Sequence, residues 1–395
     1  MKRFFNVREQ RPALILAIIV SSTSLAGRPC ESAEPVFEVL ESRGKYLHVS
    51  PDGEYFLVNI QGSGKPASTL YSTSNFKEVA KFKEVAKFDT HVSFNHVGSS
   101  IKITRWDKGL RIWNISERKD SATLDAPFTG FSALSPNDRY FVASQKAGQV
   151  TVWDVPTGRK LAELQRVKKS TLCWPGFSEN GETFFIRNTN QFWFYDTRTW
   201  KLSNTLNVPQ TSRRLVISPD AKQVAARSGV LGNENSKGIV RVWDVSTGEL
   251  SGLWSRETSF LQCVEFLKRS NAIVIAFNEK DGTNTVEVWD SALKNRRCSI
   301  GGLESFIRRK SISLDQEILV AATTDHVIRM YDLKTGKERG VVVEKPGKRV
   351  RSTFFFPGGR HVGAEVIPAG ELTSRRDQRT RIWRVQQALQ GNDSD

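Results

Sequence analysis

The chain has 395 residues, of which 38% are hydrophobic and 25% are charged, a balance typical of a core-forming protein and not of a disordered one. Lys and Arg number 58 against 42 Asp and Glu, and the formal net charge of +16 favours an acidic partner or surface. Five His and four Cys leave little material for metal clusters or a disulfide framework, which disfavours the usual metal and haem routes to catalysis.

The first 26 residues have the pattern of a secretory signal peptide. Four basic residues precede the apolar run 13–20, and small residues lead to an expected cleavage after Ala26. The run of about eight apolar residues is shorter than the roughly 20 that cross a bilayer, and no later segment is long enough. We therefore expect an exported protein, periplasmic or secreted, that is not a transmembrane protein. The alternative is an uncleaved N-terminal anchor. A short linker, 27–35, follows.

A repeat of about 40 to 52 residues fills the rest of the chain, which is the length of a four-stranded propeller blade. Each copy has an aromatic marker at the end of a predicted strand, and most markers are followed by Asp. Turn signals such as Ser50-Pro51-Asp52-Gly53 come before the markers, so the copies are predicted to be β-hairpins. The aromatic markers, each given with the Asp that follows it where there is one, are Tyr71, Trp113, Trp153, Asp154, Tyr195, Asp196, Trp243, Asp244, Trp289, Asp290, Tyr331, Asp332 and Trp383.

These motifs resemble those of WD40-type β-propellers of the divergent, exported bacterial kind, and the resemblance covers residues 36–385. The Trp-Asp dipeptides at 153–154, 243–244 and 289–290 carry it. The family's Gly-His dipeptide is missing, so its usual Asp-His-Ser-Trp hydrogen-bond tetrad is not expected. The resemblance implies an all-β fold: a single propeller of four-stranded antiparallel blades. Their strands are lettered a to d from the central channel outward, and the marker ring on strand c packs against the neighbouring blade. It also implies scaffolding of other proteins, although a fold alone does not determine function.

The repeats predict how many blades there are and how the ring closes. Strand a begins near residues 45, 89, 130, 172, 213, 261, 308 and 350, which predicts eight blades, with seven as the alternative. After Trp383 only a polar tail, 386–395, remains, and it is unsuited to a fourth strand. The alternating segment 36–40 precedes the first blade. We expect it to become strand d of the last blade and so to protect the sheet edges.

One segment of the first repeat is duplicated. Phe76–Lys81 recurs immediately as Phe82–Lys87. A functional insertion is one interpretation. We favour the other, a tandem duplication that is tolerated in an outer strand and its loop.

Motifs for catalysis and cofactor binding are absent from the sequence. There is no Cys-x-x-Cys-His, His-Glu-x-x-His or Gly-x-Ser-x-Gly, and Gly62–Lys65 matches only the end of a phosphate loop. His91 and His96 have no third ligand nearby, so we expect no metal site. We predict that the protein is not an enzyme and has no cofactor. The alternative is a propeller enzyme such as a hydrolase or a quinone-dependent dehydrogenase. The repeats of the latter class place a Trp about four residues after the turn Gly, whereas here Trp254 follows Gly248 two residues later than that.

The cysteines are predicted to form no disulfide within the propeller. Cys173 and Cys263 fall on strands a of different blades, whereas Cys298 falls on a strand d. Disulfide partners need Cα atoms within about 7 Å, and these positions are expected to be further apart. Cys30 is the one thiol that could be modified or pair between molecules.

The positive charge is predicted to lie on one face of the propeller. The loops that join strand d to strand a and strand b to strand c carry about 27 basic and about 12 acidic residues, against about 17 of each on the opposite face. We expect this basic face of a monomer to dock an acidic protein, an anionic polysaccharide or another envelope polymer, and we expect no nucleic acid because of export. The alternatives are a solvated surface and a purely structural envelope protein. The residues assigned to this face are Lys168, Lys169, Arg213, Arg214, Arg308, Arg309, Lys310, Lys348, Arg349, Arg351, Arg375 and Arg376.

Overall fold

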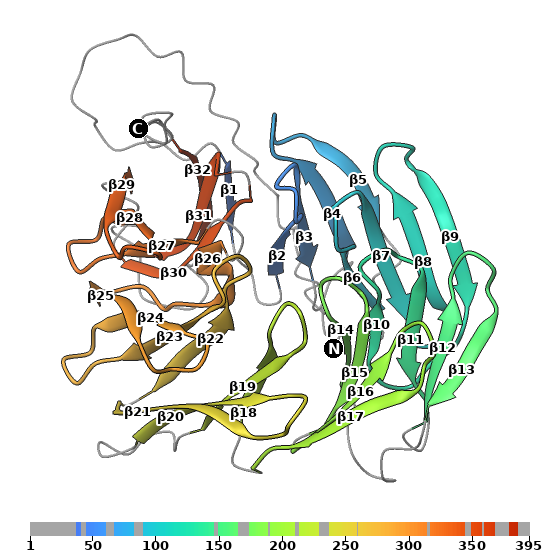
Figure 1. The fold of residues 1–395 in the computed structure, drawn as a ribbon. Coiled ribbons are helices and arrows are strands. Elements are labelled where there is room, and N and C mark those ends of the chain that lie inside the picture. The colour runs from blue at the N-terminus through green and yellow to red at the C-terminus, as the bar shows by residue number, and fades with distance from the viewer. Residues whose placement is uncertain are drawn as a thin grey trace, which may run out of the picture.

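Eight four-stranded antiparallel sheets form a ring of blades (Figure 1). The prediction of an all-β, eight-bladed propeller is confirmed, and the alternative of seven blades is wrong. Among the residues described, no helix is long and apolar enough to span a membrane. The computed structural model describes residues 37–40, 45–60, 67–82, 90–145, 149–164, 174–188, 190–209, 213–228, 237–258, 260–313, 317–343, 349–357, 359–367 and 379–385.

The first four blades follow one another along the chain, each in the order a, b, c, d. Blade 1 contains β2 (Lys45–Val49), β3 (Tyr55–Ile60), β4 (Ala67–Ser72) and β5 (Glu78–Phe82). Blade 2 contains β6 (Thr90–Phe94), β7 (Ser100–Arg105), β8 (Gly109–Asn114) and β9 (Lys119–Asp125). Blade 3 contains β10 (Ser132–Leu134), β11 (Tyr140–Ser144), β12 (Val150–Asp154) and β13 (Lys160–Leu164). Blade 4 contains β14 (Trp174–Phe177), β15 (Thr183–Arg187), β16 (Gln191–Asp196) and β17 (Leu202–Asn207).

Blades 5 to 7 repeat this plan, with one short 3₁₀ turn before strand a of blade 7, whereas blade 8 takes its strand d from β1. Blade 5 contains β18 (Arg213–Ile217), β19 (Gln223–Ser228), β20 (Lys237–Asp244) and β21 (Leu250–Glu257). Blade 6 contains β22 (Leu261–Phe266), β23 (Ala272–Asn278), β24 (Asn284–Asp290) and β25 (Arg296–Leu303). Blade 7 contains η3 (Arg309–Ser311), β26 (Ile312–Ser313), β27 (Ile318–Ala322), β28 (Ile328–Asp332) and β29 (Glu338–Val343). Blade 8 contains β30 (Arg349–Phe355), β31 (His361–Ile367), β32 (Arg379–Arg384) and β1 (Phe37–Leu40).

The N-terminal strand closes the ring, as predicted. β1 pairs antiparallel with β32, with Phe37 opposite Ile382 and Leu40 opposite Arg379. Figure 1 shows these two strands side by side although they lie near opposite ends of the chain. The first copy of the duplicated segment supplies the outer strand β5 of blade 1, also as predicted, whereas residues 83–89 lie outside the described part of the chain.

The hydrophobic core lies between blades. Each of the eight clusters of buried residues joins two neighbouring sheets. Five clusters include a buried aromatic marker, and the partly buried markers Tyr71, Trp153 and Trp289 pack against the other three. The Trp113 ring meets the ring of Phe82 in blade 1 edge-on, with 5.2 Å between centroids. Trp383, 1% exposed, packs against Val320 and Ile328 of blade 7. The predicted packing of the marker rings on the neighbouring blade is therefore confirmed.

The Asp after a marker organises the turn from strand c to strand d. Asp244 Oδ1 accepts a hydrogen bond from the Ser246 hydroxyl and bonds from the backbone N–H groups of Thr247 and Ser246 at 3.1 and 2.8 Å. The hydroxyl bond first, and then the backbone bonds, hold the pKa of Asp244 below its usual value. Gly248 follows with φ +74°, a left-handed conformation that glycine adopts at little cost. The Trp-Asp…Thr-Gly pattern thus describes a marker ring in the core followed by a capped turn.

Blade 7 departs from the predicted strand start near residue 308. The chain forms the 3₁₀ turn Arg309–Ser311, and strand a of this blade is then only two residues long. The Ser311 hydroxyl donates to the carbonyl of Thr353 in blade 8 at 2.8 Å, which ties the turn to the next blade before the strand begins.

Candidate functional site

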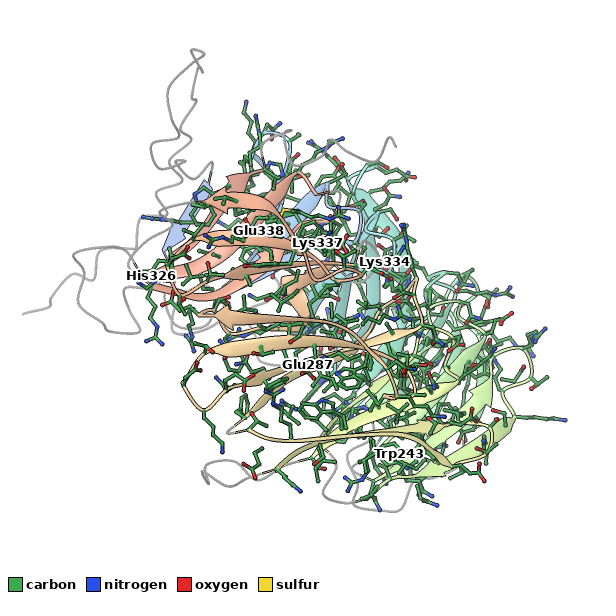
Figure 2. All side chains as sticks on the ribbon, turned by 60° about the vertical axis from the view of Figure 1, so that its left-hand side comes forward. Trp243, Glu287, His326, Lys334, Lys337 and Glu338 are labelled. Atoms are coloured by element: carbon green, nitrogen blue, oxygen red, sulfur yellow. The ribbon has the colours of Figure 1, made fainter. Side chains whose placement is uncertain are left out.

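The b-to-c and d-to-a loops share one face of the propeller, which we call the rim face. Hydrogen bonds join the two kinds of loop: Phe128 N–H donates to the Trp106 carbonyl at 2.9 Å, and the His326 ring bonds the Glu304 carboxylate at 2.7 Å. Figure 2 shows His326 at one end of blade 7 and Lys334, in its c-to-d turn, at the other end. The loops assigned from the sequence to the basic face therefore lie together.

The structure describes the side chains of five residues assigned to this face. Arg308, Arg309 and Lys310 lie at or in η3, and Arg349 and Arg351 are exposed on β30. The backbones of Arg213 and Arg214 belong to β18, but their side chains are outside the described part. The other assigned residues lie entirely outside it: Lys168, Lys169, Lys348, Arg375 and Arg376.

Three of these cations are paired with carboxylates of inner strands. Lys310 Nζ lies 3.0 Å from Glu365 Oε1, and Arg308 lies 3.8 Å from the same atom. Arg309 lies 3.7 Å from Glu265. Burial alone would raise the pKa of Glu365, but Lys310 and Arg308 lower it below its usual value. Part of the loop charge is therefore neutralised within the molecule. Loop counting misses this effect because both carboxylates lie on strands.

Aromatic side chains lie where strand a begins in four blades. Phe131 precedes β10, Trp174 opens β14, Phe260 precedes β22 and Phe306 precedes η3. They contact one another in pairs: the Phe131 and Trp174 ring centroids are 5.3 Å apart, and those of Phe260 and Phe306 are 5.7 Å apart. The rim face therefore combines positive charge with aromatic surface.

Arginines cover three of these rings. The guanidinium carbon of Arg187 lies 5.0 Å from the Trp174 centroid, that of Arg227 lies 5.4 Å from Phe260, and that of Arg308 lies 5.8 Å from Phe306. Such stacking gains cation–π energy and leaves the guanidinium edge able to donate to an anion. Arg308 was assigned to this face from the sequence, but none of the three stacked pairs was predicted. The sequence contains a signal for the first two pairs. Arg187 and Arg227 occupy equivalent positions on strand b, each three residues after the residue that pairs with the aromatic marker of strand c.

A second polar cluster joins blades 5 and 6 at Glu287, on β24 (Figure 2). Its carboxylate is 1% exposed and accepts the indole N–H groups of Trp254 and Trp289 at 3.0 and 2.9 Å. Arg256 and Arg296 donate to its other oxygen. Four donors occupy the carboxylate, so it lacks a free acceptor position for acid–base chemistry, and its role is to join the two sheets. This cluster was not predicted from the sequence.

Other reactive groups are dispersed. Within the described ranges, no group of three or more His, Cys, Asp or Glu is placed to hold a metal ion. Cys263 and Cys298 are free thiols. Burial and, to a smaller extent, the negative charge of Asp332 raise the pKa of Cys298, which makes this thiol a poor nucleophile. Cys30 and Cys173 lie outside the described part.

Among solved structures, the C-terminal WD40 domain of Sif2 has a TM-score of 0.57 to this chain at 14% identity, over 90% of the chain and 97% of that domain. The fold is that of a WD40-like β-propeller. The computationally designed Ika8 protein is similar to this WD40-like propeller to the same degree, with a TM-score of 0.57 and 16% identity over 86% of the chain and 95% of Ika8. At such identities the likeness concerns the fold alone.

Comparison by sequence matches part of the WD40-like propeller. Autophagy-related protein 16 from Arabidopsis thaliana is 27% identical over 167 residues, which are 40% of this chain and 31% of the plant protein. The match thus spans about a third of the length of that relative. No family model matches the chain.

Proposed function

We propose that this WD40-like propeller is a non-enzymatic scaffold, exported as a monomer, that docks an acidic partner on its rim face. The observation that carries the proposal is the set of three stacked pairs Trp174–Arg187, Phe260–Arg227 and Phe306–Arg308 on that face. Arginine held against an aromatic ring offers pre-ordered donors for a carboxylate, and aromatic residues and Arg are enriched in protein interfaces.

Further features support the proposed kind of partner and the proposed compartment. The net charge of +16 favours acidic proteins or anionic envelope polysaccharides, and the signal-like first 26 residues favour a periplasmic or secreted location. Nucleic acid is a poor partner in that compartment. The WD40 fold supports a role in protein interaction, and the plant relative shares part of the repeat array.

Charge reversal on the two faces tests this function. Arg309 and Arg349 are exposed on the rim face, whereas Lys334 and Lys337 are exposed in the c-to-d turn of blade 7. The variant R309E/R349E should bind poly-glutamate about tenfold more weakly than the native chain, with a smaller salt dependence. The variant K334E/K337E has the same charge change on the opposite face and should bind almost as tightly as the native chain.

Titration of fluorescent poly-glutamate and of heparin gives the affinities, and crosslinking in native envelopes gives the class of the partner. Equal losses in both variants would show that net charge, and not the rim face, controls binding. Unchanged binding in a folded R309E/R349E variant would refute docking on this face.

A further inference from the structure

Two strongly exposed aromatic side chains belong to adjoining loops of the rim face. Trp106, in the b-to-c turn of blade 2, is 47% exposed, and Phe131, just before strand a of blade 3, is 40% exposed. In the described part of the chain they are the only aromatics among the exposed large hydrophobic residues. Their loops are joined by the bond from Phe128 N–H to the Trp106 carbonyl. Exposed aromatics that gather at one place mark interaction sites.

Arg187 borders this aromatic surface. It stacks on Trp174, which in turn contacts Phe131. Burial lowers the pKa of Arg187, and no carboxylate in the described ranges pairs with it, in contrast to Arg308 and Arg309. Half-buried charges are normally paired, because desolvation is costly without a counter-charge. The site therefore has a place for an anion supplied from outside.

The polar groups around the rings are already used. Ser144 Oγ accepts the N–H of Phe131 at 2.9 Å and donates to its carbonyl at 2.8 Å. Gln145 donates to the carbonyl of Pro127 at 2.9 Å. A hydroxyl-rich glycan would find few free partners here, whereas an apolar side chain and one carboxylate would both be accommodated.

We propose that Trp106, Phe131, Trp174 and Arg187 form a docking site for an acidic peptide segment of a partner protein. A carboxylate of the segment pairs with Arg187, and an adjacent aromatic or large aliphatic side chain covers Phe131 and Trp106. This proposal rests on the proposed function, because it specifies which part of the rim face binds and what it binds. It adds an apolar requirement that charge alone does not impose.

Selection from a random hexapeptide library displayed on phage, with the purified full chain as the target, tests the site. We expect enriched peptides to carry Asp or Glu next to Phe, Trp, Tyr, Leu or Ile. The variant R187Q should bind a selected peptide about tenfold more weakly and lose the acidic preference. K108Q, which removes an exposed charge from the neighbouring turn, should change the affinity less than twofold. F131A should keep the acidic preference and lose the apolar one.

Near-ultraviolet circular dichroism confirms that each variant is folded, and R187K provides a second variant that keeps the charge but lacks the planar stacking group. Enrichment without an acidic preference, or unchanged affinity in both Arg187 variants, would overturn the proposal. Binding to a glycan array without peptide enrichment would also overturn it. If R187Q binds normally while R309E/R349E loses poly-glutamate, the rim-face function stands and this site does not. If neither variant changes binding, both proposals fail.

Discussion

Replacing Glu287 by glutamine should lower the free energy of unfolding by about 2 kcal/mol, although the side-chain volume hardly changes. The carboxylate accepts bonds from two indoles and two guanidiniums. A glutamine has one acceptor oxygen, so its NH2 group faces two donors whichever way the amide turns. Two of the four bonds are therefore lost, and donors face donors in their place.

The size of the effect depends on which donors lose their acceptor. Arg256 and Arg296 have side chains 40% and 44% exposed, so water can solvate them, whereas Trp254 is 6% exposed. The amide oxygen should therefore stay with the indoles, and each half-exposed guanidinium bond should cost about 1 kcal/mol. E287A leaves all four donors without the carboxylate and creates a cavity. It should cost about 4 kcal/mol, as when one partner of a buried ion pair is removed.

Guanidinium denaturation followed by tryptophan fluorescence measures these changes, because Trp254 and Trp289 lie at the site. E279Q is the matched control: Glu279 is 26% exposed and bonds Arg256 alone, so its replacement should cost less than about 1 kcal/mol. Equal midpoints for E287Q and E279Q would refute the reasoning. So would an E287A variant no less stable than E287Q.

Three further predictions concern a buried histidine, a c-to-d turn and the duplicated segment. Burial lowers the pKa of His361 to about 4, so the unfolded chain binds a proton between about pH 6.5 and 4 that the folded chain does not. His361 alone should make stability fall by about 2 kcal/mol from pH 7.5 to pH 5, and His91, whose pKa burial also lowers to about 4, adds to that fall. H361F should therefore reduce the total fall by about 2 kcal/mol without abolishing it; equal pH slopes in urea titrations would contradict this. G248A should cost about 1 kcal/mol in thermal unfolding from backbone strain alone, because nothing lies within 4 Å of the added Cβ; an unchanged midpoint would mean that the turn relaxes. Deleting residues 82–87 puts Phe88 in the place of Phe82 and leaves Asp89 alone to link β5 to β6, in place of residues 83–89. The shortest link from a strand d to the next strand a is 258–260, so the deletion variant should lose cooperative melting measured by circular dichroism. A Gly-Ser replacement of 83–88 at the same length should melt normally, and a cooperative deletion variant would show that the link has slack.

The fold was readable from the sequence because each blade repeats the same local solution. A marker such as Trp243 has to enter the core between sheets, and Asp244 and Gly248 have to make the turn that follows, so the requirement recurs at a fixed period. The outer strand of blade 8 was predictable because β1 has the alternating pattern of a strand but belongs to no repeat next to it in the sequence, so its partner has to come from elsewhere in the chain. Blade 7 was less predictable, since a tertiary bond from Ser311 to blade 8 replaces the start of its strand.

The candidate site was only partly predictable, for two physical reasons. Loop position assigns Arg308 and Arg309 to the rim face, but it does not reveal their partners Glu365 and Glu265, which come from strands far away in sequence. The stacking of Arg187 on Trp174 depends on a register that pairs these two residues across neighbouring strands. Charge counting gives the sign of a surface, whereas pairing and stacking are set by the three-dimensional neighbours.

The pairing of β1 with β32 also constrains the order of folding. Phe37 meets Ile382, so this contact cannot form until nearly the whole chain is present, and contacts this remote in sequence form slowly. The other blades consist of consecutive hairpins, which can form earlier from local contacts. Blade 8 is therefore expected to be completed last. Until then β32 presents an open edge, so the yield of this protein should depend on how quickly its ends meet as well as on the stability of the closed ring.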